Sequence, residues 1–184
     1  TSVSDSVAPA VTGSKAMTGT AVNDAPVFAL STAQPTVNED AAAQSILAFA
    51  TGIGPGGGTD EAGQTSTFTL TPGATTGNLT FSTAPAISSN GTLSFTPTAN
   101  TNGTATFTVT LQDNGGTANG GVNTSTTRNF TITVNAVNDV PSFTIAGNPP
   151  VTGPGVGIQT VTNFATNINR GGGTDEATQG LVFI

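Results

Sequence analysis

The chain lacks several residue types on which common kinds of site depend. Its 184 residues include no cysteine, histidine, tryptophan or tyrosine, and all ten aromatic residues are phenylalanine. Without cysteine there is neither a disulfide framework nor a thiolate metal site. Without histidine or cysteine the usual nucleophile and general-base pairs of enzymes are missing, and no tryptophan or tyrosine is available as a platform for a sugar ring. We therefore expect no catalytic activity.

Positive charge is also scarce. Three Lys and Arg residues stand against ten Asp and Glu residues, which gives a formal net charge of -7 at pH 7. This balance disfavours nucleic acids and anionic membranes as partners and makes cations the natural counterpart. No apolar run approaches the roughly 20 residues that span a bilayer, and the first residues lack a basic segment followed by an apolar core. We expect a soluble segment without membrane insertion that is an internal or processed piece of a longer protein.

What the chain does contain is a series of short apolar runs with period two, set among Gly, Thr, Ala and Asn. The clearest run is TATFTVTLQD, in which Ala105, Phe107, Val109 and Leu111 share one face of an expected strand and threonines share the other. Asn-Gly pairs between the runs suit tight turns, and no segment has helical periodicity. Hydrophobic residues make up 35% of the chain, which argues against disorder.

The first complete stretch of this pattern predicts seven strands. They are expected near Pro26–Leu30, Gln44–Ala50, Ser66–Leu70, Asn78–Phe81, Gly91–Pro97, Thr104–Gln112 and Arg128–Asn135. Seven short antiparallel strands in a domain of roughly 100 residues are typical of a two-sheet sandwich of the immunoglobulin type, here without the cysteine pair and tryptophan of antibody domains.

A tandem repeat organises the whole chain. AVNDAPVF at Ala21–Phe28 returns as AVNDVPSF at Ala136–Phe143, and GGGTDEA at Gly56–Ala62 returns at Gly171–Ala177, both with a shift of 115 and no gap. Over 49 aligned positions, 21 are identical. We interpret residues 1–20 as an extension or the end of a preceding repeat, 21–135 as a complete repeat, and 136–184 as the first part of the next one, truncated at Ile184.

The acidic residues are concentrated at the ends of the expected strands. Nine of the ten lie in the motifs VND, NED, TDE and QDNGG. The loops of a sandwich gather at its two ends, and VNAVNDVP leaves no spacer between repeats, so acids of adjacent repeats should meet at the junction. Clustered carboxylates repel each other by about 1 kcal/mol per pair at 4 Å in water. Calcium relieves this repulsion with six to eight oxygen ligands.

These motifs together carry a family resemblance. V-N-D-x-P, then V-N-E-D, then G-T-L-x-F-x-P-x-x-N-x-x-G-x-A-x-F-x-V-x-L-x-D-N-G-G resembles the cadherin-like, immunoglobulin-like tandem repeats of large bacterial surface proteins and adhesins, over Ala21–Ile184. The resemblance implies an all-β fold of seven-stranded immunoglobulin/cadherin-like β-sandwiches in tandem, the second copy truncated. It also implies calcium between successive domains.

The resemblance assigns ligand roles only where a motif matches. Asn23 and Asp24 resemble the ligands in the linker, Asp113 the acid that ends the penultimate strand, and Glu39 the acid facing the following junction. Asp60 and Glu61 take the place of the family's acidic pair, as adjacent residues rather than D-x-D. Two calcium sites are therefore expected. The first would use Asn23, Asp24, Asp60, Glu61 and Asp113, and the second Glu39, Asp40, Asn138, Asp139, Asp175 and Glu176.

Plainer interpretations exist for the same residues. The Asn-Asp pairs suit turns before proline, the TDE acids suit a solvated loop, and Asp113 suits a hairpin turn. The outward threonines are either good strand residues facing water or an ice-binding or carbohydrate-binding array.

The function we expect is that of a structural and adhesive repeat in an extracellular stalk, fibre or adhesin on a bacterial surface, with calcium stiffening the junctions. Its partners would be neighbouring repeats or subunits of the same protein, with surface glycans or other cells as further candidates. The alternative is a subunit of a filament or sheath, assembled by strand donation between neighbouring chains. A lectin-like module is a third class, for which the sequence offers no aromatic cluster.

Overall fold

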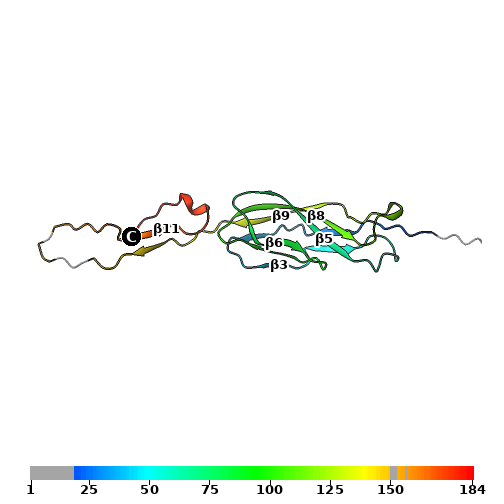
Figure 1. The fold of residues 1–184 in the computed structure, drawn as a ribbon, viewed down its shortest axis with the longest axis horizontal. Coiled ribbons are helices and arrows are strands. Elements are labelled where there is room, and N and C mark those ends of the chain that lie inside the picture. Colours follow the sequence, from blue (N-terminus) through cyan, green and yellow to red (C-terminus); the bar gives the residue numbers. More distant parts are fainter. Residues whose placement is uncertain (1–18, 150–152, 156) are drawn as a thin grey trace, which may run out of the picture.

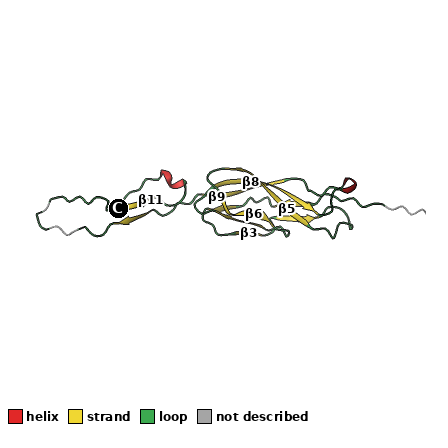
Figure 2. Ribbon diagram, in the orientation of Figure 1, coloured by secondary structure: helices red, strands yellow, loops and turns green. Residues whose placement is uncertain are grey.

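The computed structural model describes residues 19–149, 153–155 and 157–184. Two units lie end to end along the long axis, a complete sandwich and a more open second unit (Figure 1). Strands form nearly all of the regular structure of the described residues, and the two helical segments are single 3₁₀ turns (Figure 2). Within those residues, no helix has the length and hydropathy that crossing a bilayer requires.

The complete unit contains nine strands and one 3₁₀ turn. They are β1 (Val27–Leu30), β2 (Thr36–Asn38), β3 (Gln44–Ile46), β4 (Ala50–Gly54), β5 (Ser66–Thr75), β6 (Phe81–Ile87), β7 (Leu93–Pro97), β8 (Gly103–Asp113), η1 (Ala118–Gly120) and β9 (Arg128–Asn135).

These strands form the two layers of an immunoglobulin-like sandwich. One layer is the four-stranded sheet β2-β9-β8-β5. The other contains the three-stranded sheet β3-β7-β6 and the pair β1-β4, in which β4 continues the chain path of β3. All pairs are antiparallel except β2 with β9, which run parallel. The expected all-β sandwich is confirmed.

The core lies between the layers and follows the period-two pattern. On β8 the side chains of Ala105, Phe107, Val109 and Leu111 are buried, and β9 buries its alternate residues in the same way. The ring of Phe107 stacks on that of Phe130 with centroids 5.3 Å apart. The inward faces predicted for these two strands are therefore correct.

Two of the predicted strands are wrong, because the chain turns within the segments where they were expected. Gln44–Ala50 is not one strand, because Ala48 has a left-handed φ of 53° that separates β3 from β4. Asn78–Phe81 is not a strand either. Asn78 lies in a turn, where its side chain accepts a hydrogen bond from the backbone of Asn102 (2.9 Å), and β6 begins only at Phe81.

Two further differences concern the edges of the four-stranded sheet. The strand β2 was not expected, because its three residues are too few to show alternation. β5 extends to Thr75, beyond the expected Leu70, with a register irregularity between Pro72 and Thr75. Proline in such an edge strand removes a backbone donor, which discourages pairing with another chain.

The second unit repeats the first hairpin of the complete unit. It contains β10 (Ser142–Ile145), β11 (Ala165–Asn169) and the 3₁₀ turn η2 (Asp175–Thr178). These are the two strands of this unit within the residues that the structure describes. The register of β10 with β11 equals that of β1 with β4 after the shift of 115.

Buried and exposed aromatic pairs distinguish the two units. Phe28 and Phe68 meet edge to face at 5.2 Å, and their counterparts Phe143 and Phe183 do so at 5.1 Å. The first pair is buried, whereas the second is exposed. The local packing is thus the same in both copies, and the described part of the second unit lacks counterparts of β8 and β9 to cover it.

Core packing predicts the cost of removing one side chain. Leu111 on β8 is fully buried, so Leu111→Ala should lower the free energy of unfolding by about 2–5 kcal/mol, through lost burial and the cavity left behind. Leu47 is 76% exposed, and Leu47→Ala is the matched control with little expected effect. Urea denaturation measures both. Equal losses for the two variants would contradict the assignment of Leu111 to the core.

Candidate cation sites at the two ends of the sandwich

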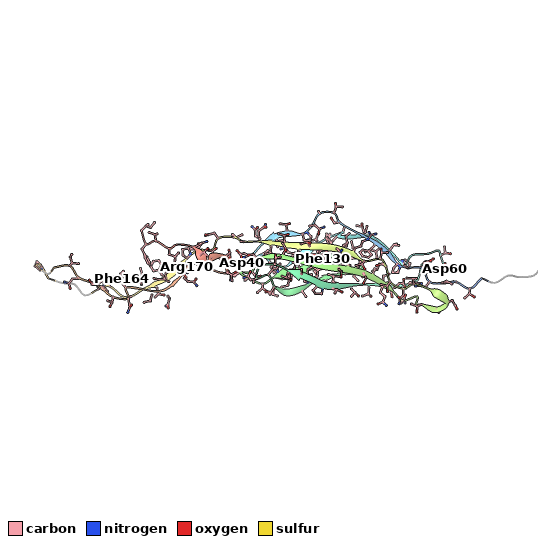
Figure 3. The ribbon with its side chains drawn as sticks, turned by 90° about the horizontal axis from the view of Figure 1, so that it is seen from above. Asp40, Asp60, Phe130, Phe164 and Arg170 are labelled. Carbon is pink, nitrogen blue, oxygen red and sulfur yellow. The ribbon has the colours of Figure 1, made fainter. Side chains whose placement is uncertain are left out.

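The two groups of predicted ligands lie at opposite ends of the complete unit. Figure 3 shows Asp60 at the outer end and Asp40 at the end that faces the second unit. This separation follows from antiparallel topology, which places alternate loops at opposite ends of a sandwich. Asp60 belongs to the first expected calcium site and Asp40 to the second, so the two expected sites are represented at opposite ends.

At the outer end, Asn23 and Asp113 are joined directly. The side-chain amide of Asn23 donates to Asp113 Oδ1 (3.0 Å) and to the carbonyl of Val122 (2.7 Å). Gly115 N also donates to Asp113 Oδ1 (2.9 Å). Asp113 is the last residue of β8 and only 5% exposed, because it continues the inward side of the strand. Its other oxygen, Oδ2, is buried without a hydrogen-bond partner.

The two acids of the first TDE motif have different environments. Glu61 is 2% exposed, and its carboxylate accepts hydrogen bonds from the backbone N–H groups of Asp24 and Gly57. Asp60 is exposed. The glutamate therefore ties the loop to the VND segment at the start of the unit, whereas the aspartate faces solvent.

The glycines of GGGTDEA allow this loop to close over the VND segment. Gly56 has a φ of 113°, in the left-handed range that favours glycine, and a side chain there would collide with the carbonyl of Ala25. A side chain on Gly57 would collide with Asp24 Oδ2. In the second copy Gly172 has the same relation to Asp139 Oδ2. The repeated motif is thus explained by a close approach of two backbone segments.

At the junction, a buried glutamate connects the two units. Glu39 lies just after β2 and is 4% exposed. Its carboxylate accepts from the backbone N–H of Val137, which belongs to the second unit, and from the Asn102 side chain (3.4 Å). In the second unit, Asp139 N donates to Glu176 Oε1 (3.0 Å), as Asp24 N does to Glu61.

Asn100, in the loop between β7 and β8, adds a second contact across the junction. Its backbone N–H donates to Asp40 Oδ1 (2.8 Å), and its side chain lies against Gly172. Gly172 N in turn donates to Asp139 Oδ2 (3.0 Å). The junction therefore consists of side chains from one unit packed against the backbone of the other.

Several residues of these networks were not among the candidates predicted from the sequence. Gln64 donates to Asn23 Oδ1 (2.7 Å), and its counterpart Gln179 donates to Asn138 Oδ1 (2.9 Å). Gln64 and Gln179 are identical at the shift of 115, which was the available signal. Asn100 is the N of the P-x-x-N-x-x-G stretch in the family motif, which was its available signal, whereas Asn102 has only the turn signal of its Asn-Gly pair.

Whether these residues suit a cation depends on their buried side-chain oxygens that accept no hydrogen bond. Within the described parts of the chain, the buried side-chain oxygens without a hydrogen-bond partner are Gln64 Oε1, Asp113 Oδ2, Asp175 Oδ1 and Glu176 Oε2. Among the described residues, no group of three or more acidic side chains gathers closely enough to hold a metal ion. A cation at either end would therefore need amide and backbone carbonyl oxygens as well, which calcium accepts.

The strand order defines an immunoglobulin-like domain, with polar networks at both ends of the sandwich. Residues 23–125, more than half of the chain, match the family model of the bacterial Ig domain, and the chain belongs to this family. Neither the curated proteins nor the solved structures gave a significant match. Domains of this family are typically structural modules of surface proteins rather than enzymes.

The roles of the two TDE acids can be separated by mutation. Glu61→Ala removes the acceptor of two backbone N–H groups and should lower the free energy of unfolding by about 1–3 kcal/mol, because those groups would lose their partner. Asp60→Ala, one residue away and exposed, should change it by less than about 0.5 kcal/mol. Thermal and urea unfolding in a calcium-free buffer measure both values. A larger loss for Asp60→Ala would refute the assigned roles.

Proposed function

We propose that the chain is a repeat module of an extracellular bacterial stalk, fibre or adhesin, in which calcium bound at the junctions stiffens the array. The main support is the junction itself, where Glu39 of one unit bonds to Val137 of the next without a spacer. Glu176, from the second unit, has a buried carboxylate oxygen without a donor.

The chemistry of the unpaired oxygens favours a hard cation. A buried carboxylate oxygen without a partner destabilises the fold, and a divalent ion would offset that cost. The chain has a net charge of -7 and no cysteine or histidine, so oxygen-binding ions suit it better than ions that prefer nitrogen or sulfur. Asn23, Gln64 and Asp113 would contribute at the outer end. Asp139, Asp175 and Glu176 would do so at the junction.

Calcium also fits the proposed location. Extracellular calcium modules have dissociation constants of about 10⁻⁴ to 10⁻³ M, so such sites fill outside cells and stay empty inside. A bound ion would restrict the motion of one unit against the other. That restriction would turn a chain of separate domains into a stiff rod that holds other parts of the protein away from the cell.

Calcium titration tests this proposal. At 10 mM calcium, one filled site with such an affinity should add about 1.4–2.7 kcal/mol to the free energy of unfolding relative to chelator. Small-angle X-ray scattering should show a narrower distribution of lengths as the junction site fills. Asp113→Asn should reduce the stabilisation, whereas the exposed Asp60→Asn is the matched control and should keep it. Equal stability in calcium and chelator, or an equal effect of magnesium, would exclude a calcium-specific role.

The exposed apolar face of the second unit favours a second candidate function, that of a filament subunit completed by strand donation. Phe143, Ile145, Ile168 and Phe183 are all exposed. A strand from a neighbouring chain could cover them as β8 and β9 cover the first unit.

The assembly state separates the two candidates. Strand donation predicts that the purified 184-residue chain forms concentration-dependent oligomers that survive dilution, measured by light scattering. A chain that stays at its monomer mass of 18.0 kDa at every concentration would refute this alternative.

A further inference from the structure

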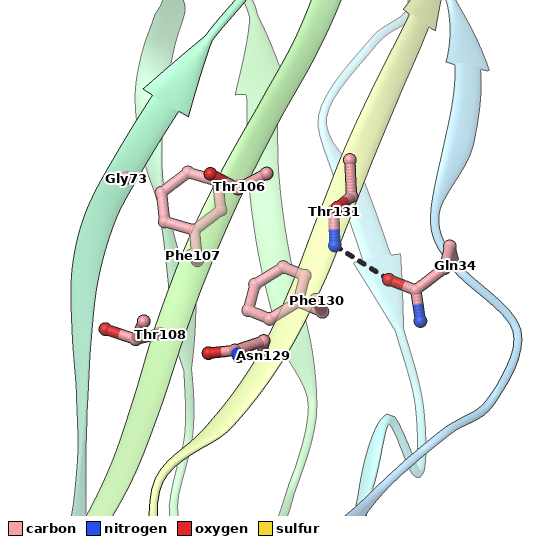
Figure 4. Close-up of a pocket in the computed structure, with 8 residues that line it drawn as sticks. All are labelled: Gln34, Gly73, Thr106, Phe107, Thr108, Asn129, Phe130 and Thr131. Carbon is pink, nitrogen blue, oxygen red and sulfur yellow. Dashed lines mark hydrogen bonds between the residues drawn. The ribbon is translucent and has the colours of Figure 1, made fainter.

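A groove crosses the outer face of the four-stranded sheet, away from both ends of the sandwich. It has a volume of about 460 Å³, within the range of ligand sites. The residues around it come from β5, β8, β9 and the segment before β2, as Figure 4 shows. They are Gln34, Gly73, Thr106, Phe107, Thr108, Asn129, Phe130 and Thr131.

A glycine on the edge strand lies in the lining of the groove. Gly73 lies opposite Thr106, and a side chain there would approach Thr106 Oγ1 to 2.6 Å. Pro72 and Thr75 bound the irregular part of β5, which runs beside the row of threonines on β8. Beneath the strands, the stacked rings of Phe107 and Phe130 form a packed support. The groove is therefore a fixed feature of the sheet.

Polar groups in the groove are available to a ligand. Among the described residues, the side chains of Asn129 and Thr131 make no intramolecular hydrogen bond, and Asn129 is exposed. Gln34 Oε1 accepts from Thr131 N (2.7 Å), which fixes the orientation of the amide. The Gln34 nitrogen then has only a 3.5 Å contact to the carbonyl of Thr32 and keeps a free N–H.

The lining contains no ionisable side chain. Nine of the ten acids lie instead in the motifs at strand ends. The groove thus offers amide and hydroxyl groups, which both donate and accept hydrogen bonds, in an uncharged setting. A ligand that complements it must be neutral and rich in groups of the same dual kind.

We propose that this groove binds a neutral polysaccharide chain. Sugar hydroxyls both donate and accept, and so match Asn129, Thr131 and the oriented amide of Gln34. An extended peptide would instead seek unpaired backbone groups at a sheet edge, whereas the backbone of β8 and β9 is already paired inside the sheet. The site goes beyond the proposed role at the junctions, since it lies on the sheet face and needs no cation.

The experiment titrates the isotope-labelled 184-residue chain with neutral hexasaccharides of β-1,4-glucose, β-1,4-N-acetylglucosamine and α-1,4-glucose, observed by amide NMR. At least one sugar should shift the amide signals of Gly73, Thr106, Thr108 and Thr131 at millimolar concentration. Asn129→Ala should weaken this binding by about fivefold or more, through the loss of hydrogen bonds. Gln34→Glu should weaken it similarly, because it keeps the acceptor for Thr131 N and removes the donor.

The matched control is Gln112→Ala. Gln112 is an exposed amide on the same face of β8, outside the groove, and its removal should leave the affinity unchanged. An unaltered melting temperature of each variant shows that the fold is intact. The proposal is overturned if no sugar shifts these signals, if Gln112→Ala weakens binding as much as Asn129→Ala, or if an uncharged Gly-Ser-Thr hexapeptide binds in place of the sugars. Chelator should not change the result, which separates this site from the calcium proposal.

Discussion

The carboxylate of a buried glutamate, bonded to the backbone amide of the VND aspartate, is the constraint on which each unit depends. Glu61 makes this contact with Asp24, and Glu176 makes it with Asp139. Hydrogen bonds to a charged acceptor are stronger than those between neutral groups, and burial excludes competing water. Gly57 and Gly172 let the two backbone segments approach each other in the first and second unit. In each unit a glutamine, Gln64 or Gln179, donates a hydrogen bond to the asparagine that precedes the aspartate. The direction in which the chain enters each unit is thereby fixed.

The second copy shows which parts of this arrangement are local. It keeps the hairpin register, the buried glutamate and the aromatic pair, although its aromatic rings stay exposed. Positive φ angles recur at matching positions, Ala48 with Asn163 and Gly52 with Asn167. The first two-fifths of the repeat therefore specify their own backbone. Burial of the core requires β8 and β9, which are far along the chain and supply the opposite wall in the complete unit.

This difference also explains how much could be predicted from the sequence. Strands with four or more alternating residues, such as β8 and β9, were located well because one face is buried along their whole length. β2 and the break at Ala48 depend on tertiary contacts and backbone strain that no apolar pattern reveals. For the candidate site, the motifs grouped the acids into two sets, and Asp60 of the first set and Asp40 of the second lie at opposite ends of the complete unit. They did not reveal that Glu61 is buried while Asp60 is exposed, since that depends on how closely the glycines let two segments approach. Asn100 was missed although it is the N of P-x-x-N-x-x-G, because that motif does not show which segment the side chain will face, and Asn102 has only the turn signal of its Asn-Gly pair.

The distribution of charge separates two directions of interaction in this fold. Acids and the amides that hold them lie at the ends, so contacts between successive repeats would involve charged groups and would respond to salt. The outer face of the four-stranded sheet is built from threonine, asparagine and glutamine, so lateral contacts there are neutral and insensitive to ionic strength. The two sets share no side chain, and sites without shared partners vary almost independently in energy. If the groove binds the proposed ligand, substitutions on the face would change that binding and leave the junction unchanged, because the residues of the junction lie in loops and nearly all of those that line the groove lie on strands.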